Sequence, residues 1–133
     1  MEVMEMSDMA LKTGMKKSKD RLVREFLAEF GVLILGGLMI SLLYANNLLL
    51  TAWEILLGAF GLSIWRKDED LAFFAVGAVF GPLGEMICIR FGVWAYANPT
   101  ALGIPLWLPF AWGFASLLIR RTSGTMTALL SAE

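Results

Sequence analysis

The chain has 133 residues, of which 58% are apolar and 17% charged, with a net charge of −1. Soluble domains average about 45–50% apolar and about 25% charged residues, so the composition indicates a single membrane domain. The absence of histidine excludes histidine-based acid–base catalysis and the commonest metal ligand, and the lone Cys88 excludes an intrachain disulfide. No cluster of acidic residues or cysteines has metal-ligand spacing, so we predict no metal site and no cofactor.

Residues 1–24 form a polar head that holds six basic residues together with four acidic ones. We expect most of this head to be disordered and cytoplasmic. Leu22, Phe26 and Phe30 recur at a spacing of four, which predicts a helix that runs from the head into the membrane. The head has no aromatic residues between its basic ones, so anionic lipid head groups are better expected partners than nucleic acid.

Four apolar stretches follow the head, at residues 26–44, 48–65, 71–94 and 104–119. A membrane-spanning helix needs about 20 mostly apolar residues, with a range of about 17–25. The pattern predicts an all-α, integral membrane four-helix bundle over residues 25–121, followed by a polar cytoplasmic tail at 122–133. Pro82 inside the third span predicts a kink there, because proline removes one helical hydrogen bond.

The connections between the spans set the orientation. The Ala45–Asn47 turn joins the first two spans, and the charged run 66–70 joins the second span to the third. The uncharged loop 95–103 joins the third span to the fourth. With four spans, the head, the charged loop and the tail share one side and hold ten of the eleven basic residues. The positive-inside rule then places both termini in the cytoplasm. The mixed leader and the lack of a clear cleavage site predict no cleaved signal peptide.

Three ionisable residues within spans are candidate site residues, because such groups are costly in lipid and usually face the bundle interior. Glu54, Glu85 and Arg90 lie about 9, 14 and 6 Å below the outer ends of their helices, at about 1.5 Å per residue. Glu54 and Arg90 share a depth, which favours a cross-helix ion pair. That pair either joins two helices or orients Glu85.

Glu85 is then the carboxyl without a partner. Burial disfavours its charged form, so a neutral Glu85 near the membrane midplane could donate a proton. The alternative is a hydrogen bond to a carbonyl freed by Pro82. Gly77, Gly81 and Gly84 surround this segment and predict close approach of a neighbouring helix or of a ligand.

Aromatic residues gather on the predicted outer side. Trp94, Tyr96 and Trp107 fit either an interfacial belt or the lining of a site for a flat, polyunsaturated ligand. Asn98, together with Asn46, Asn47 and Thr100, would add polar groups at the same place.

The stretch from Gly81 to Gly113 resembles the C-terminal half of an uncharacterised family of short polytopic prokaryotic membrane proteins. The shared features are Glu85 in a span, the Gly92-Val93-Trp94-Ala95-Tyr96 exit, the Asn98-Pro99 loop and the Ile104-Pro105-Leu106-Trp107 start of the last span. The resemblance implies a multi-pass protein of a prokaryotic inner membrane but brings no assigned activity. More distantly, the arrangement is similar to the membrane carotenoid-hydratase family of bacterioruberin synthesis, whose members are longer and carry further helices.

Three functions fit these patterns. The first is binding of a lipid or isoprenoid-like ligand, or scaffolding of a membrane partner, without chemistry. The second is acid catalysis on an isoprenoid double bond, with Glu85 as proton donor, Glu54 or Arg90 orienting it, and the aromatic residues stabilising positive charge. The third is proton-coupled transport by a homo-oligomer, in which Glu85 is the coupling carboxyl.

Overall fold

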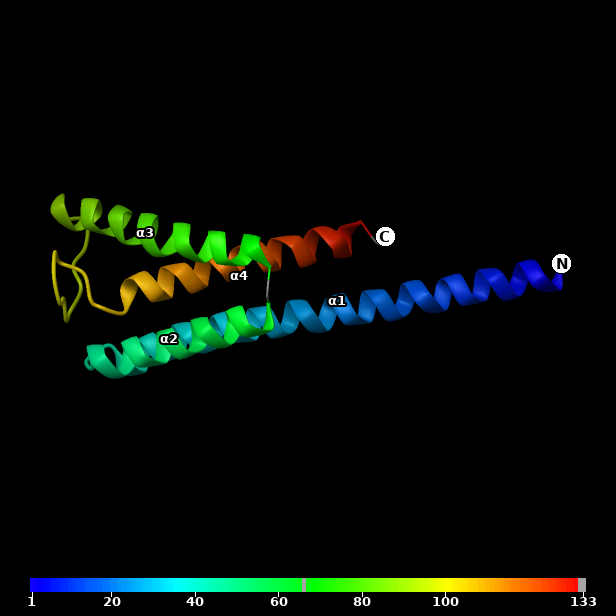
Figure 1. Ribbon diagram of the computed structural model, residues 1–133, viewed down its shortest axis with the longest axis horizontal. Helices are drawn as coiled ribbons and strands as arrows, with labels where there is room; N and C mark the ends of the chain where they lie inside the picture. The colour runs from blue at the N-terminus through cyan, green and yellow to red at the C-terminus, as the bar shows by residue number, and fades with distance from the viewer. Residues whose placement is uncertain (66, 132–133) are drawn as a thin grey trace.

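The computed structural model describes residues 1–65 and 67–131, which form four α-helices. These are α1 (Glu2–Leu43), α2 (Asn47–Ile64), α3 (Asp68–Arg90) and α4 (Leu108–Leu130). Both termini lie at one end of the molecule, which we call the proximal end (Figure 1). The α1–α2 turn and the long connection 91–107 lie at the opposite, distal end. The predicted all-helical class and the number of helices are therefore confirmed.

The packing centres on α4, which contacts each of the other three helices. Its buried residues are Leu108, Gly113, Phe114, Leu117, Leu118 and Thr125. The closest partner of α4 is α3. A Cβ on Gly77 would overlap Ser116, and one on Gly81 would overlap the Trp112 ring. These two glycines therefore serve helix packing, whereas a Cβ on Gly84 would meet nothing within 4 Å.

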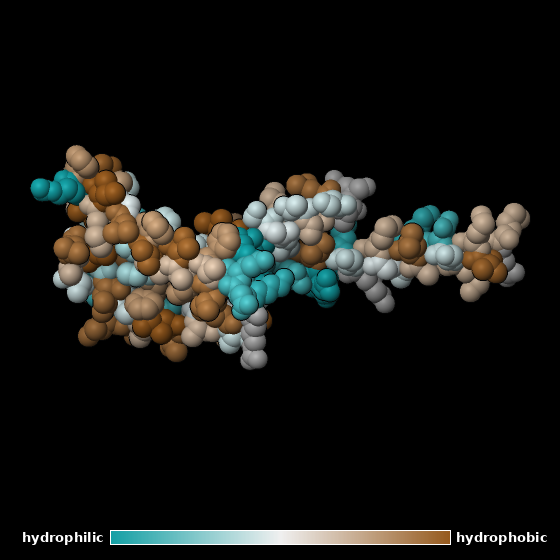
Figure 2. All heavy atoms as spheres, turned by 45° about the horizontal axis from the view of Figure 1, so that its top comes forward, coloured by the Kyte–Doolittle hydropathy of each residue, from teal (hydrophilic) through white to brown (hydrophobic). Residues whose placement is uncertain are grey.

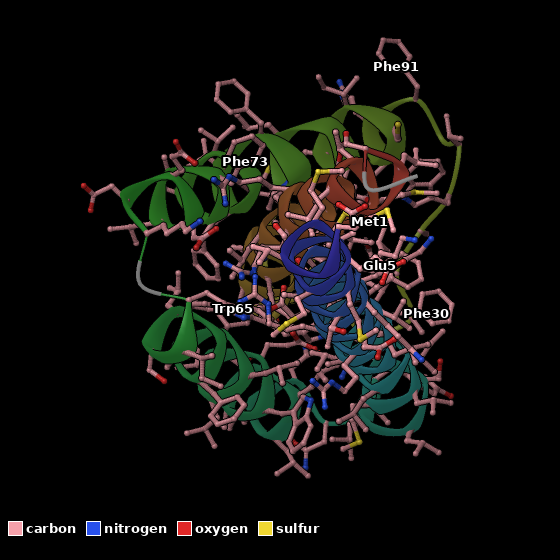
Figure 3. The ribbon with its side chains drawn as sticks, turned by 90° about the vertical axis from the view of Figure 1, so that its right-hand side faces the viewer. Met1, Glu5, Phe30, Trp65, Phe73 and Phe91 are labelled. Atoms are coloured by element: carbon pink, nitrogen blue, oxygen red, sulfur yellow. The ribbon has the colours of Figure 1, made fainter. Side chains whose placement is uncertain are left out.

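The outer surface of the bundle is apolar. Leu38 on α1, Phe60 on α2 and Phe80 on α3 are each more than half exposed. Figure 2 shows brown apolar side chains over the bundle and a teal polar band at its proximal end. In Figure 3, Phe30 and Phe73 point away from the bundle. Among the described residues, α1, α2 and α3 are long and apolar enough to cross a membrane.

Two helices are longer than expected. Residues 2–24, which we expected to be disordered, continue α1 and project beyond the bundle (Figure 1). Strong helix formers dominate this segment, and an i,i+4 ion pair joins Arg21 to Glu25 with N–O atoms 3.7 Å apart. The tail expected from residue 122 is helical as well, because α4 runs to Leu130.

The bounds of the third span also differ from the prediction. Asp68, Glu69 and Asp70 were assigned to a loop, but they form the first turn of α3, where acidic side chains favour a helix N-terminus. Arg66, from the same predicted loop, lies outside the described residues. The helix ends at Arg90 rather than Trp94, and it runs without interruption through the buried Pro82.

Candidate functional site: an apolar groove and the distal end

The distal end is held by hydrogen bonds between its two connections. The Asn47 Nδ2 atom donates to the Asn98 carbonyl oxygen at 2.8 Å and to Thr100 Oγ1 at 3.0 Å. In return, Asn98 Nδ2 donates to the Ala45 carbonyl oxygen at 3.1 Å. The polar residues expected together at this end are thus brought together, and they join the α1–α2 hairpin to the α3–α4 hairpin.

The long connection reverses direction at a tight turn. Leu102 and Gly103 have φ values of 52° and 80°, and an antiparallel bridge pairs Ala101 with Ile104. A Cβ on Gly103 would come 2.8 Å from Ile89 Cγ2, so glycine also allows the turn to pack closely on α3. The turn leads into Trp107 and Leu108, both buried, at the start of α4.

Glu85 lies beside the aromatic residues of this connection. Trp94 Nε1 donates a hydrogen bond to Glu85 Oε2 at 2.7 Å. The pKa of Tyr96 is raised to about 12 by burial, and then by the charge of Glu85 and a hydrogen bond with it. Tyr96 therefore stays a neutral phenol. Its ring meets that of Trp107 edge-on, with centroids 5.9 Å apart. The four residues Glu85, Trp94, Tyr96 and Trp107, which were predicted to belong to one site, therefore lie next to one another.

An apolar groove, here called the α1/α4 groove, runs between α1 and α4. Its distal part has a volume of about 350 Å³, and its lining residues are Ile40, Tyr96, Trp107, Leu108, Ala111, Trp112 and Ala115. Its deeper part has a volume of about 150 Å³, and its lining residues are Val32, Leu33, Gly36, Gly37, Ile40, Glu54, Ala111, Phe114, Ala115 and Leu118. The two parts share Ile40, Ala111 and Ala115. The two parts therefore lie next to each other along about 17 Å of α4, from Trp107 to Leu118, at 1.5 Å per residue.

Small residues on both helices open the groove. A Cβ added at Gly37 would meet nothing within 4 Å, and one at Gly36 would come no closer than 3.9 Å to Leu57. On the facing helix, Ala111 and Ala115 form the wall. The space beside Gly37 is therefore empty, and this glycine packs against no neighbouring helix.

Glu54 lines the deeper part of this groove, and it does not pair with Arg90. Only 2% of Glu54 is exposed, and its Oε1 atom has no hydrogen-bond partner among the described residues. Arg90 is exposed at the end of α3, where it joins no ion pair with Glu54. The predicted cross-helix pair is therefore wrong, because α4 separates most of α2 from α3.

The remaining predicted site residues lie apart from the groove. Pro82 is buried on α3, and Asn98 belongs to the hydrogen-bonded distal connections. Pro82 and Asn98 do not line the groove, and the same is true of Glu85 and Trp94. Of the predicted ligand-binding set, Tyr96 and Trp107 line it.

Sequence reasoning missed a buried ion cluster at the proximal end, here called the basal ion cluster. Asp70 is 0% exposed and is paired with Arg120 and, at 3.0 Å, with Arg121. Arg120 also pairs with Glu69, and the guanidinium of Arg121 lies 4.5 Å from the Trp65 ring centroid.

Glu29 completes this cluster. It is 2% exposed, accepts a hydrogen bond from Thr125 Oγ1 at 3.2 Å and lies 3.7 Å from Arg121 Nε. Its position in the apolar stretch after Phe26 was the available signal. An antiparallel four-helix order places that position, the start of the third helix and the end of the fourth at one end of the bundle.

Fold and site together define an all-helical chain with an apolar exterior, a charged proximal end and a lateral apolar groove. No family model matches the chain, and neither a curated protein nor a solved structure is similar to it.

Proposed function

We propose that this chain is a multi-pass membrane protein that binds a lipid or isoprenoid-like ligand in the α1/α4 groove. The observation that carries the proposal is the groove itself, which has an almost wholly apolar lining apart from Glu54. Ligand sites combine mostly apolar walls with a few polar groups. An apolar groove on an apolar bundle surface would open to lipid chains rather than to water.

The membrane part of the proposal is supported by the exposed surface. In water, burial of an apolar side chain contributes about 1.5–3 kcal/mol, so a soluble bundle would turn large apolar residues inward. Here residues such as Leu56, Phe60 and Phe80 point outward. The basic residues Lys67, Arg120 and Arg121 lie together beside Leu22 and Glu25 of α1, on one side of the apolar stretches, as a positive-inside orientation requires.

Labelling of single cysteines tests the orientation. In a Cys88→Ser background, Ser18→Cys, Ser123→Cys and Ala97→Cys would each carry one thiol. With both termini in the cytoplasm, a membrane-impermeant maleimide should label only position 97 in intact cells and all three positions in lysed cells. Labelling of position 18 or 123 in intact cells would refute the proposed topology.

Retention of ligand tests the groove. Gly37→Leu would fill the open space in the groove, whereas Gly31→Leu, on the same helix, would add the same side chain at a site outside the lining. We expect native mass spectrometry of mildly solubilised protein to detect bound lipid on the wild type and on Gly31→Leu, with at least a tenfold loss on Gly37→Leu. Equal retention by all three proteins would refute the groove as the binding site.

Acid catalysis by Glu85 has less geometric support. Its carboxyl accepts a hydrogen bond from Trp94 and lies beside Tyr96, but it does not line the groove. The carboxyl that lines the groove is that of Glu54.

A further inference from the structure

Glu54 is a buried carboxyl for which the described chain supplies no partner. It is 2% exposed, it lines the deeper part of the α1/α4 groove, and its Oε1 atom accepts no hydrogen bond. Leaving a buried acceptor unsatisfied costs about 1–3 kcal/mol, and more for a charged group. Such a group is therefore either a defect or a site that a ligand completes.

Comparison with the basal ion cluster favours a ligand. Glu29 is as deeply buried as Glu54, and its Oε2 atom also has no hydrogen-bond partner among the described residues, but its Oε1 atom accepts a hydrogen bond from Thr125 and lies 3.7 Å from Arg121 Nε. Asp70, fully buried, is held by two arginines. Each of these two carboxylates therefore has at least one donor or cation beside it, whereas the described residues supply none to Glu54. Around Glu54 the walls are instead apolar or small, from Gly36 and Gly37 on α1 to Ala115 on α4.

Trp107 adds a second unsatisfied group to the same groove. Its Nε1 atom is buried without an acceptor, and its side chain lines the distal part. Glu54 lies seven residues into α2 from Asn47, which is about 10 Å from the distal end at 1.5 Å per residue. The groove is therefore lined by a residue with an unpartnered carboxyl oxygen at depth and by one with an unpartnered indole N–H near its distal end, among the described residues.

Building on the proposed function, we infer that the groove selects a lipid alcohol, whose hydroxyl donates a hydrogen bond to Glu54 while its apolar chain fills the groove. A hydroxyl fits this position because it is a donor and carries no charge. An ammonium group would bring a second buried charge, and an unsubstituted hydrocarbon would leave Oε1 unsatisfied. The chain would pack against Ile40, Ala111 and Ala115.

The test compares two probes that differ only in the hydroxyl. A dibrominated octadecanol and the dibrominated octadecane with the same chain would each be titrated into protein in phosphatidylcholine nanodiscs. Bromine quenches tryptophan fluorescence at short range, and Trp107 and Trp112 line the groove. Because the two probes also partition differently into lipid, the readout is the ratio of their affinities, compared between variants.

We expect the wild type to prefer the alcohol by about tenfold, the factor expected of one additional hydrogen bond. Glu54→Leu should reduce this preference to less than about twofold, and Glu54→Gln should keep most of it, since the amide oxygen still accepts. Thr51→Val is the matched control. Thr51 lies about one helical turn before Glu54 and does not line the groove, and its buried hydroxyl donates a hydrogen bond to the Asn47 carbonyl oxygen at 2.6 Å. Removing this hydroxyl should leave the preference for the alcohol unchanged.

A second measurement compares the alcohol with the alkane on the wild type itself, so its main result does not depend on how well variants fold. Infrared difference spectra should show a shifted carboxyl band when the alcohol is added and none with the alkane. This shift should be absent in Glu54→Gln. A band that does not move would overturn the inference.

The outcomes separate this inference from the proposed function. If the wild type binds both probes equally and Gly37→Leu weakens both, the groove binds lipid but Glu54 does not select a hydroxyl. If Glu54→Leu keeps the tenfold preference, another group recognises the alcohol and the inference is again overturned. If Gly37→Leu changes neither probe, the groove is not the site, and the proposed function fails as well.

Discussion

The contact between α3 and α4 makes a quantitative prediction at Gly77. A Cβ there would overlap the Ser116 hydroxyl and lie 2.6 Å from the backbone oxygen of Trp112. Backbone cannot rotate away as a side chain can, so Gly77→Ala must separate the two helices. Over-packing costs typically about 1–3 kcal/mol, and the backbone clash indicates the upper half of that range. Against this, alanine gains about 1 kcal/mol over glycine inside a helix. The net expectation is destabilisation by about 1–2 kcal/mol.

Gly84→Ala is the matched control, on the same helix and in the same sequence segment. Its new methyl group would meet nothing within 4 Å, so only the gain in helix propensity remains. We expect this variant to be about 0.5–1 kcal/mol more stable than the wild type. Reversible unfolding in mixed dodecylmaltoside and dodecyl sulfate micelles, followed by circular dichroism, measures both. If Gly77→Ala proves as stable as Gly84→Ala, the α3–α4 packing described above is incorrect.

Three further predictions concern the proximal end, the distal turn and the candidate acid. Asp70→Asn should destabilise the bundle by about 3 kcal/mol or more in the same unfolding assay, because it removes the buried counter-charge that Arg120 and Arg121 share and leaves Arg120 only the exposed Glu69; a loss below 1 kcal/mol would contradict this. Leu102→Asn should raise stability by about 0.5–1 kcal/mol, since asparagine tolerates the left-handed conformation found there and the leucine side chain is 78% exposed; no gain would argue against the turn. Glu85→Gln should keep the native fold and its bound lipid, as judged by native mass spectrometry, because the amide oxygen still accepts from Trp94; loss of an isoprenoid product in this variant alone would instead support acid catalysis.

The number of helices and the places where they turn were predictable from the sequence. Four apolar stretches separated by polar residues correspond to the four helices, and Asn46 caps α2 by accepting a hydrogen bond from the Leu49 amide at 3.0 Å. Hydropathy located the four apolar stretches, but it could not locate the ends of α1 and α4. Both helices continue through polar residues, because helix propensity does not depend on apolar character.

The candidate site was predictable in part, and the part that failed has a topological cause. Glu85, Trp94, Tyr96 and Trp107 follow one another through one helix end and one connection, so the chain itself keeps them close. Glu54 and the groove depend on which helices are neighbours. Depth along the bundle was a poor guide, because equal depth does not imply contact when a third helix intervenes.

The position of α4 explains why its sequence looks least like a membrane span. Among the described helices, α4 is as long as α3 but is the one that is not apolar enough to count as a candidate span, yet it packs against all three others. A helix surrounded by other helices need not be apolar on every side, since its polar side chains can find partners inside the bundle, as Arg120 and Arg121 do.

That arrangement also explains where the groove lies. The α1/α4 groove exists because small residues on α1 and α4 leave part of this central helix uncovered. A chain that needed only a stable bundle could close this gap with one larger residue at Gly37. That the gap instead leads to an unpartnered carboxyl is the strongest physical argument that the groove is built to be filled by something other than protein.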